Sequence, residues 1–162
     1  MMQAMEKAEV LIEALPYIQK FSDAIVVIKF GGSAMEDPEL TRKTMRDIVL
    51  LDAIGMKPVV VHGGGKAITA RLRELNIETK FINGLRYTCD RTIAVVDDVL
   101  HNVTNKALVD GIRASGAKGA QISGKKLLRA KRLTTTDKET GKELDIGYVG
   151  QVIAVDTAPI MD

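Results

Sequence analysis

A lysine and two glycines close the first apolar run of the chain, and these residue types suit the handling of a phosphoryl group. Lys29 lies near the end of the run, and Gly31 and Gly32 follow it. Glycines let the backbone approach an anion closely, and a lysine ammonium can neutralise charge on a phosphoryl group during its transfer. The alternative for Lys29 is a side chain that extends past the sheet edge into water. Composition alone slightly favours that alternative.

A second glycine cluster and a later arginine suit the binding of a negatively charged ligand. Gly63, Gly64 and Gly65 follow another apolar run, and Arg86 follows the loop that begins at Asn83. A helix that starts after such a cluster presents its N–H groups to an anion, and an arginine can hold a carboxylate through two parallel bonds. Glycines also serve in tight turns, and an arginine in a loop is more often a surface residue. Two glycine clusters after neighbouring strands nevertheless favour an anionic ligand.

The common nucleotide-binding patterns do not match this second cluster. A P-loop needs a glycine where Val60 stands and a serine or threonine where Ala67 stands. The Rossmann pattern needs a small residue where Ile68 stands. Any phosphate chemistry here therefore uses another architecture.

The elements before these clusters predict an α/β fold. Residues 24–30 and 58–62 are β-branched apolar runs, typical of parallel strands that are buried on both faces. Between them, Asp37 and Pro38 suit the start of a helix and Gly55 suits its end. Parallel strands joined by right-handed crossovers explain this order, with helices on the faces of the sheet.

The second half of the chain predicts a long helix followed by strands. A helix is expected over residues 88–114, with an apolar stripe. The stripe consists of Ile93, Val96, Leu100, Val103 and Ala107. A short strand is expected near residues 120–123. Residues 127–136 and 144–155, separated by a polar turn, predict a β-hairpin appended to the parallel sheet.

Both ends of the chain carry helical signals. Residues 3–21 have apolar residues at helical spacing, with Pro16 predicted to kink or break the helix. Such a helix packs either on its own core or on a partner chain, and the sequence does not choose between them. Residues 157–162 are typical of a helix that has only begun, with Asp156 or Thr157 as its cap. We therefore expect a truncated chain.

Composition excludes several classes of function. The 162 residues carry 23 basic and 21 acidic side chains, a formal net charge of +2 that indicates no nucleic-acid surface. Cys89 is the only cysteine, and His62 and His101 lie far apart, so neither a disulfide framework nor a metal site is expected. The sequence has no signal peptide and no apolar run of membrane-spanning length, which predicts a cytoplasmic protein without a membrane partner.

Several segments together resemble the amino acid kinase family. They are Lys29-Phe30-Gly31-Gly32-Ser33, Val61-His62-Gly63-Gly64-Gly65 and Asn83-Gly84-Leu85-Arg86-Tyr87-Thr88. Two further segments resemble its acetylglutamate kinase branch, namely Asn105-Lys106 and Asp145-Ile146-Gly147-Tyr148-Val149-Gly150. The resemblance covers nearly the whole chain in the right order. It implies a three-layer α-β-α sandwich with a mainly parallel central sheet and an appended β-hairpin.

The resemblance also implies a reaction and a role for each candidate residue. The reaction is phosphoryl transfer from MgATP to the side-chain carboxylate of N-acetyl-L-glutamate, in arginine biosynthesis. Lys29 would stabilise the transition state, with Gly31 and Gly32 near the transferring phosphate. Gly64 and Gly65 would bind the substrate through their backbone. Arg86 would hold the α-carboxylate of the substrate.

The resemblance further implies a division of the chain and its partners. Residues 1–22 would form a kinked helix for oligomerisation, and residues 23–162 the substrate-binding lobe. The ATP-binding lobe would be missing, so the chain alone should be inactive and should hold no tightly bound cofactor. The full-length enzyme would be a homo-oligomer, a dimer or a hexamer, with arginine as a possible feedback inhibitor. Lys66 and Ala67 depart from the family, where an uncharged pair is more usual.

Two alternatives to this function stay open. One is another member of the same family, a glutamate or aspartate kinase, although the Asn-Gly-Leu-Arg and Gly-Tyr-Val-Gly segments argue against it. The other is a non-catalytic binding or oligomerisation module.

Overall fold

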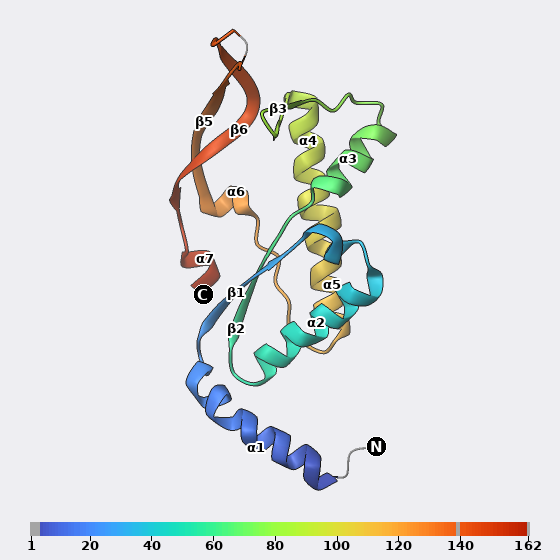
Figure 1. Ribbon diagram of the computed structural model, residues 1–162, viewed down its shortest axis with the longest axis vertical. Coiled ribbons are helices and arrows are strands. Elements are labelled where there is room, and N and C mark those ends of the chain that lie inside the picture. The colour runs from blue at the N-terminus through green and yellow to red at the C-terminus, as the bar shows by residue number, and fades with distance from the viewer. Residues whose placement is uncertain (1–3, 139, 162) are drawn as a thin grey trace. The chain divides into compact units, whose positions relative to one another are not determined.

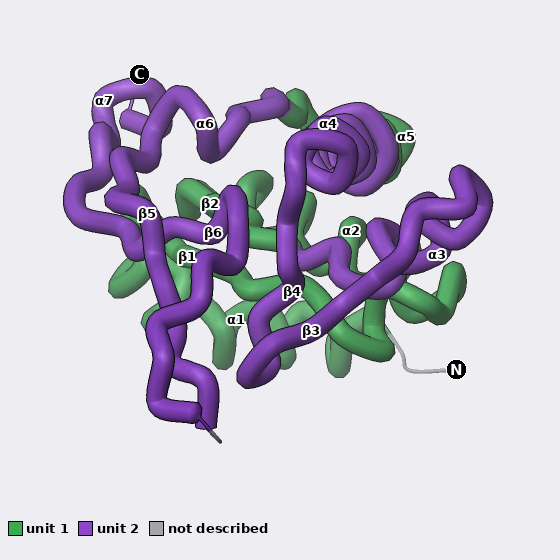
Figure 2. Tube along the Cα trace, turned by 90° about the horizontal axis from the view of Figure 1, so that it is seen from above, with its two compact units in different colours: residues 1–62, 110–119 green, residues 63–109, 120–162 purple. Residues whose placement is uncertain are grey.

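The computed structural model describes residues 4–138 and 140–161 and has two compact units (Figure 2). The first unit holds residues 1–62 and 110–119, and the second holds residues 63–109 and 120–162. Met1 to Gln3, part of the predicted N-terminal segment, and Asp162, the last residue of the predicted half-helix, lie outside the described residues. No helix within the described residues combines the length and the apolar character that crossing a membrane requires.

The first unit is built on two parallel strands and the helix that connects them (Figure 1). Strand β1 (Ile25–Phe30) pairs with β2 (Lys57–His62), and helix α2 (Pro38–Ala53) lies between them in sequence. The Asp37 carboxylate caps α2 by accepting bonds from the backbone N–H groups of Glu39 at 2.8 Å and Leu40 at 3.0 Å. Gly55 follows the helix with φ 92°, a conformation that favours glycine. The predicted crossover and both helix signals are confirmed.

The core of the first unit covers only one face of strand β1. Phe30, Met45 and Ile48 are buried, and Gly111 packs on Met45, because a Cβ there would lie 3.1 Å from the Met45 Cγ. Exposure alternates along β1, and Val27 is 66% exposed. The prediction that this strand is buried on both faces is therefore wrong for the described residues. An apolar β-branched run has the composition of a central strand, but a two-stranded sheet leaves part of its surface open.

Helix α1 (Ala4–Phe21) contains Pro16 and has no buried residue along its described length. The predicted break at Pro16 does not occur, since helical backbone continues on both sides of it. Pro16 has no backbone N–H, so one backbone carbonyl of the preceding turn lacks its helical donor. Because the helix is exposed, water can bond to that carbonyl instead, which makes the proline tolerable. A bend at Pro16 stays a prediction.

Within its described residues, the second unit contains several helices and the β3–β4 and β5–β6 hairpins. Its elements are α3 (Gly65–Glu74), β3 (Phe81–Ile82), β4 (Leu85–Arg86), α4 (Asp90–Asp98), the π-helical segment Val99–Asn105, the first residues of α5 (Lys106–Ala114), α6 (Gly124–Leu127), β5 (Leu128–Thr136), β6 (Glu143–Val155) and α7 (Ala158–Met161). Its core joins α3 to the long helix through Ile68, Leu72 and Val99. The predicted hairpin is confirmed, as β5 pairs antiparallel with β6 in a two-stranded sheet, whereas its attachment to the parallel sheet stays a prediction.

The long helix is confirmed, but its buried stripe changes phase in the middle. Helical backbone runs from Asp90 to Ala114 and includes a π-helical segment of seven residues. From the middle of that segment onward, Val103 and Ala107 are exposed, whereas Thr104 and Leu108 are buried. A π-helix places an extra residue in the turn, so every later side chain moves one position around the axis. The predicted stripe is therefore half-buried at Ile93, Val96 and Leu100, and it is shifted by one residue from Val103 onward.

Residues 120–123 are not a strand, contrary to the prediction. No strand of the described residues includes this segment. The Gln121 side chain instead donates a hydrogen bond to the backbone oxygen of His101 at 2.8 Å. A short apolar segment becomes a strand only when a neighbour accepts its backbone bonds.

Candidate functional site

In the first unit, Lys29, Gly31 and Gly32 form the exit of β1. Lys29 is exposed on the open face of the strand and lies opposite Val61 of β2. Gly31 is extended, with φ 177°, so another residue could adopt its backbone conformation. Gly32 has φ 65° and begins the 3-10 helix Gly32–Met35. A Cβ on Gly32 would meet no atom within 4 Å, so its conformation, not crowding, favours glycine.

In the second unit, Gly64 and Gly65 lead into helix α3, and Gly64 is closely packed. A Cβ on Gly64 would lie 2.6 Å from the Leu100 Cδ2 and 3.6 Å from the Thr104 Oγ1. Only glycine fits there without movement of Leu100. Gly65 has open space at the same position. Because the partial positive charge of a helix lies at its N-terminus, this turn favours an anionic ligand.

The loop that presents Arg86 is a two-residue hairpin fixed at its tip. Asn83 and Gly84 have φ of 50° and 80°, which fits the Asn-Gly turn that joins tightly paired strands. The Asn83 Nδ2 donates to the Thr135 Oγ1 and to the Thr136 backbone oxygen, both at 2.9 Å. The hairpin is therefore tied to strand β5. In its register, Phe81 lies directly opposite Arg86.

The Arg86 guanidinium is held on one side and unpaired on the other. Its Nη2 donates to the Thr69 Oγ1 at 2.7 Å and to the Gly65 backbone oxygen at 3.3 Å. Its Cζ lies 4.7 Å from the centre of the Phe81 ring. Its Nη1 is buried and has no hydrogen-bond partner among the described residues. Burial lowers the pKa of Arg86 below its ordinary value, which marks a charge that lacks full compensation.

The Asp-Ile-Gly-Tyr-Val-Gly segment, residues 145–150, makes backbone hydrogen bonds to Thr88, which follows this hairpin. The Thr88 N–H donates to the Ile146 backbone oxygen at 3.0 Å, and the Tyr148 N–H donates to the Thr88 backbone oxygen at 2.7 Å. Between these two bonds lies Gly147, with φ 77°, where a Cβ would lie only 2.1 Å from the Thr88 oxygen. The Tyr148 hydroxyl also donates to the Asp90 Oδ1 at 2.6 Å. The Asp-Ile-Gly-Tyr-Val-Gly segment thus fixes the backbone just after Arg86.

The structure brings Gly64, Gly65 and Arg86 together within the second unit, and Lys29, Gly31 and Gly32 together within the first. Sequence reasoning missed Thr69 and Phe81, although signals for both exist. Thr69 lies four residues after Gly65, on the same face of a helix. Phe81 and Arg86 flank an Asn-Gly turn symmetrically, which makes them a cross-strand pair.

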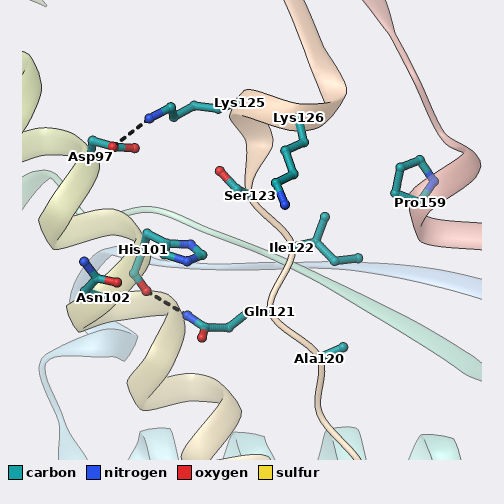
Figure 3. Close-up of a pocket in the computed structure, with 10 residues that line it drawn as sticks. All are labelled: Asp97, His101, Asn102, Ala120, Gln121, Ile122, Ser123, Lys125, Lys126 and Pro159. Carbon is teal, nitrogen blue, oxygen red and sulfur yellow. Dashed lines mark hydrogen bonds and ion pairs between the residues drawn. The ribbon is translucent and has the colours of Figure 1, made fainter.

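A cavity of about 680 Å³ in the second unit contains none of these residues (Figure 3). It is lined by Asp97, His101, Asn102, residues 120–123, Lys125, Lys126 and Pro159. On its wall the Lys125 Nζ pairs with the Asp97 Oδ2 at 2.7 Å. No group of three or more His, Cys, Asp or Glu side chains that could hold a metal ion is found within the described residues.

The sequence profile of the amino acid kinase family matches residues 24–162, and the chain belongs to that family. Within it, the chain is 45% identical to an acetylglutamate kinase of Akkermansia muciniphila, over 97% of this chain and 52% of that protein. It is 46% identical to an acetylglutamate kinase of Petrotoga mobilis, over 96% of this chain and 50% of that protein. The chain thus spans about half the length of the curated relatives it matches.

Solved structures show the same fold. An N-acetylglutamate synthase from Neisseria gonorrhoeae matches with a TM-score of 0.71 and 21% identity, over 93% of this chain and 33% of that one. A protein from Streptococcus mutans matches with a TM-score of 0.64 and 31% identity, over 85% of this chain and 53% of that one. Together with the family match, these structures confirm the predicted α/β fold of the amino acid kinases.

Proposed function

We propose that this chain is the amino-acid-binding half of an acetylglutamate kinase of arginine biosynthesis. In the full-length enzyme, the γ-phosphoryl group of MgATP would move to a side-chain carboxylate oxygen of N-acetyl-L-glutamate. The bond from that phosphorus to ADP breaks as the new P–O bond forms, and an acyl phosphate results. The similarity to acetylglutamate kinases over nearly the whole chain supports this choice over a glutamate or aspartate kinase.

The observation that carries the proposal is the state of Arg86. A buried, unpaired guanidinium nitrogen beside a helix N-terminus attracts an anion that can accept hydrogen bonds. The α-carboxylate of N-acetyl-L-glutamate is such a group. In this proposal Arg86 fixes the α-carboxylate, and the backbone of Gly64 and Gly65 contacts the rest of the substrate.

The proposal gives the residues of the first unit a separate task. The exposed ammonium of Lys29 would stabilise the negative charge that spreads over the transferring phosphoryl group. Gly31 and Gly32 would let the backbone lie close to that group, since neither carries a side chain. ATP would bind through a further lobe, so we expect no turnover and little ATP binding by this chain alone.

Binding by the 162-residue chain tests the proposed function. Isothermal titration calorimetry would compare N-acetyl-L-glutamate with L-glutamate, L-aspartate and MgATP. The proposal expects the acetylated amino acid to bind most tightly and MgATP to bind least. Tighter binding of free glutamate or aspartate would indicate the other kinases of the family. No binding of any of these acids, by a chain that circular dichroism shows to be folded, would support a non-catalytic module.

We further propose that α1 is an assembly element of a cytoplasmic homo-oligomer. Large apolar side chains are exposed along it, including Leu11 at 68% and Ile12 at 68%. Deleting residues 1–20 from the full-length protein should lower the oligomer mass in sedimentation velocity while the protein stays folded. An unchanged mass per particle would show that α1 does not join subunits. We also propose inhibition by arginine. Adding arginine to the full-length protein and to the variant without residues 1–20, and measuring the kinase activity of each, would test it.

A further inference from the structure

The hydroxyl of Thr69 lies between two parts of the candidate site. It donates to the Gly65 backbone oxygen at 2.9 Å and accepts from the Arg86 Nη2 at 2.7 Å. The same Arg86 nitrogen donates to the Gly65 oxygen at 3.3 Å. One hydroxyl therefore joins the first turn of α3 to the side chain of Arg86.

The Phe81 ring supports the same guanidinium from the neighbouring strand. Phe81 and Arg86 are opposite residues of the β3–β4 hairpin, and the Arg86 Cζ lies 4.7 Å from the ring centre. The quadrupole of an aromatic face attracts a cation at this distance. The ring and the Thr69 hydroxyl restrict the guanidinium in different ways, because the Arg86 Cζ lies over the ring and the hydroxyl bonds Nη2.

These contacts give the two terminal nitrogens of Arg86 different tasks. The Nη2 has one acceptor for each of its two N–H groups, namely Thr69 and Gly65. The Nη1 is buried and has no partner among the described residues. The tethered nitrogen thus fixes the orientation, and the other remains available to an acceptor from a ligand.

We propose that Thr69 is a positioning residue that holds Arg86 in the orientation needed to bind the α-carboxylate. This inference rests on the proposed function, in which Arg86 binds that carboxylate. Arginine has many rotamers, and a side chain that is ordered before binding loses less entropy when the ligand arrives. Without the hydroxyl, Nη2 loses its shorter bond and the guanidinium becomes free to turn.

The test measures binding of two ligands to the 162-residue chain by calorimetry. The ligands are N-acetyl-L-glutamate and its α-carboxamide, which lacks the negative group that Arg86 would bind. Thr69→Val removes the hydroxyl and keeps the shape, whereas Thr69→Ser keeps the hydroxyl. Thr44→Val is the matched control, because the Thr44 Oγ1 makes the same bond to the carbonyl four residues earlier, at 2.9 Å, on α2.

The expected result is a selective loss. Thr69→Val should weaken binding of N-acetyl-L-glutamate by about tenfold, the size of one hydrogen bond to a charged group. Its effect on the α-carboxamide should be less than about twofold, because that ligand does not use the Arg86 charge. Thr69→Ser and Thr44→Val should bind both ligands as the unmodified chain does.

Two results would overturn the inference while leaving the proposed function intact. One is unchanged binding of N-acetyl-L-glutamate by Thr69→Val. The other is an equal loss for both ligands, or a loss in Thr69→Ser as large as in Thr69→Val, which would indicate a purely structural role. If the unmodified chain binds neither ligand, the proposed function fails and the inference fails with it. Thermal unfolding of each variant would show that every comparison is made between folded chains.

Discussion

The exit of β1 around Lys29 and the hairpin around Arg86 both border glycine turns, yet the described chain builds them in different ways. Arg86 is held by contacts that span long sequence separations, to Thr69 and Gly65 of α3. Lys29 is exposed at a strand end, and a Cβ on Gly32, three residues later, would meet no atom within 4 Å. The chain thus holds Arg86, which is proposed to bind the substrate, in one orientation. It leaves Lys29, which is proposed to stabilise the transition state, exposed. Binding can therefore be tested in this chain, whereas the proposed catalytic role of Lys29 is to be tested in the full-length protein.

The largest expected effect is the loss of kcat caused by Lys29→Ala in the full-length enzyme. A charge that acts on the transition state should lower kcat by about two to three orders of magnitude and change substrate binding little. Lys57→Ala is the control, since Lys57 is an exposed lysine of the same sheet whose Nζ lies 3.2 Å from the Asp23 carboxylate. Steady-state kinetics would measure both variants. An unchanged kcat in Lys29→Ala would leave Lys29 as a side chain that only extends into water.

A smaller effect is expected from Gly147→Ala, which tests the close contact between Gly147 and the Thr88 backbone that follows Arg86. The new Cβ would lie 2.1 Å from the Thr88 oxygen, in a backbone with φ 77°. Strain and overpacking together should lower the free energy of unfolding by about 3 kcal/mol. Gly84→Ala has the same sign of φ but meets no atom within 4 Å, so it should cost about 1 kcal/mol. Urea unfolding would measure both, and equal losses would show that the contact with Thr88 is not a tight one.

The smallest effect concerns how the hydrogen bond between Tyr148 and Asp90 changes with pH. The hydrogen bond from Tyr148 to Asp90, together with the negative charge of Asp90, raises the pKa of Tyr148 above its ordinary value. A raised pKa means that the contribution to stability is complete below the ordinary value, near pH ~10, and is lost as pH rises through the folded value. Asp90→Asn should therefore lower the Tyr148 pKa in an absorbance titration of the phenolate. Tyr148→Phe identifies the signal, and an identical titration in Asp90→Asn would contradict the contact.

Local sequence signals predicted the positions of several helices and strands. Features that depend on contacts between distant residues could not be predicted. Asp37 with Pro38 predicted the start of α2, and the polar turn between two β-branched runs predicted the β5–β6 hairpin. The π-segment could not be predicted, because no sequence pattern marks the extra residue that shifts Val103 outward. Burial of β1 on both faces was predicted from composition, which does not reveal how many neighbours a strand has.

The same limit applies to the candidate site. The role of Arg86 followed from the resemblance, and the register around the Asn-Gly turn could have added Phe81. Helical spacing places Thr69 on the same face as Gly65, but the bond from Arg86 to Thr69 joins two elements separated by a loop, and no local rule predicts that bond. The roles of Lys29, Gly31, Gly32, Gly64, Gly65 and Arg86 stay predictions.

The central claim is that this chain binds a carboxylate through the unpaired Nη1 of the Arg86 guanidinium, and Arg86→Lys tests it most directly. Lysine keeps the charge and loses the planar donors, so the Kd of the chain for N-acetyl-L-glutamate should rise at least about tenfold, or about 1.4 kcal/mol. The matched control is Arg71→Lys, since the Arg71 Nη1 pairs with the Glu74 carboxylate at 2.8 Å on the surface of α3. That control should leave the Kd unchanged. A Kd for Arg86→Lys equal to that of the unmodified chain would contradict the account.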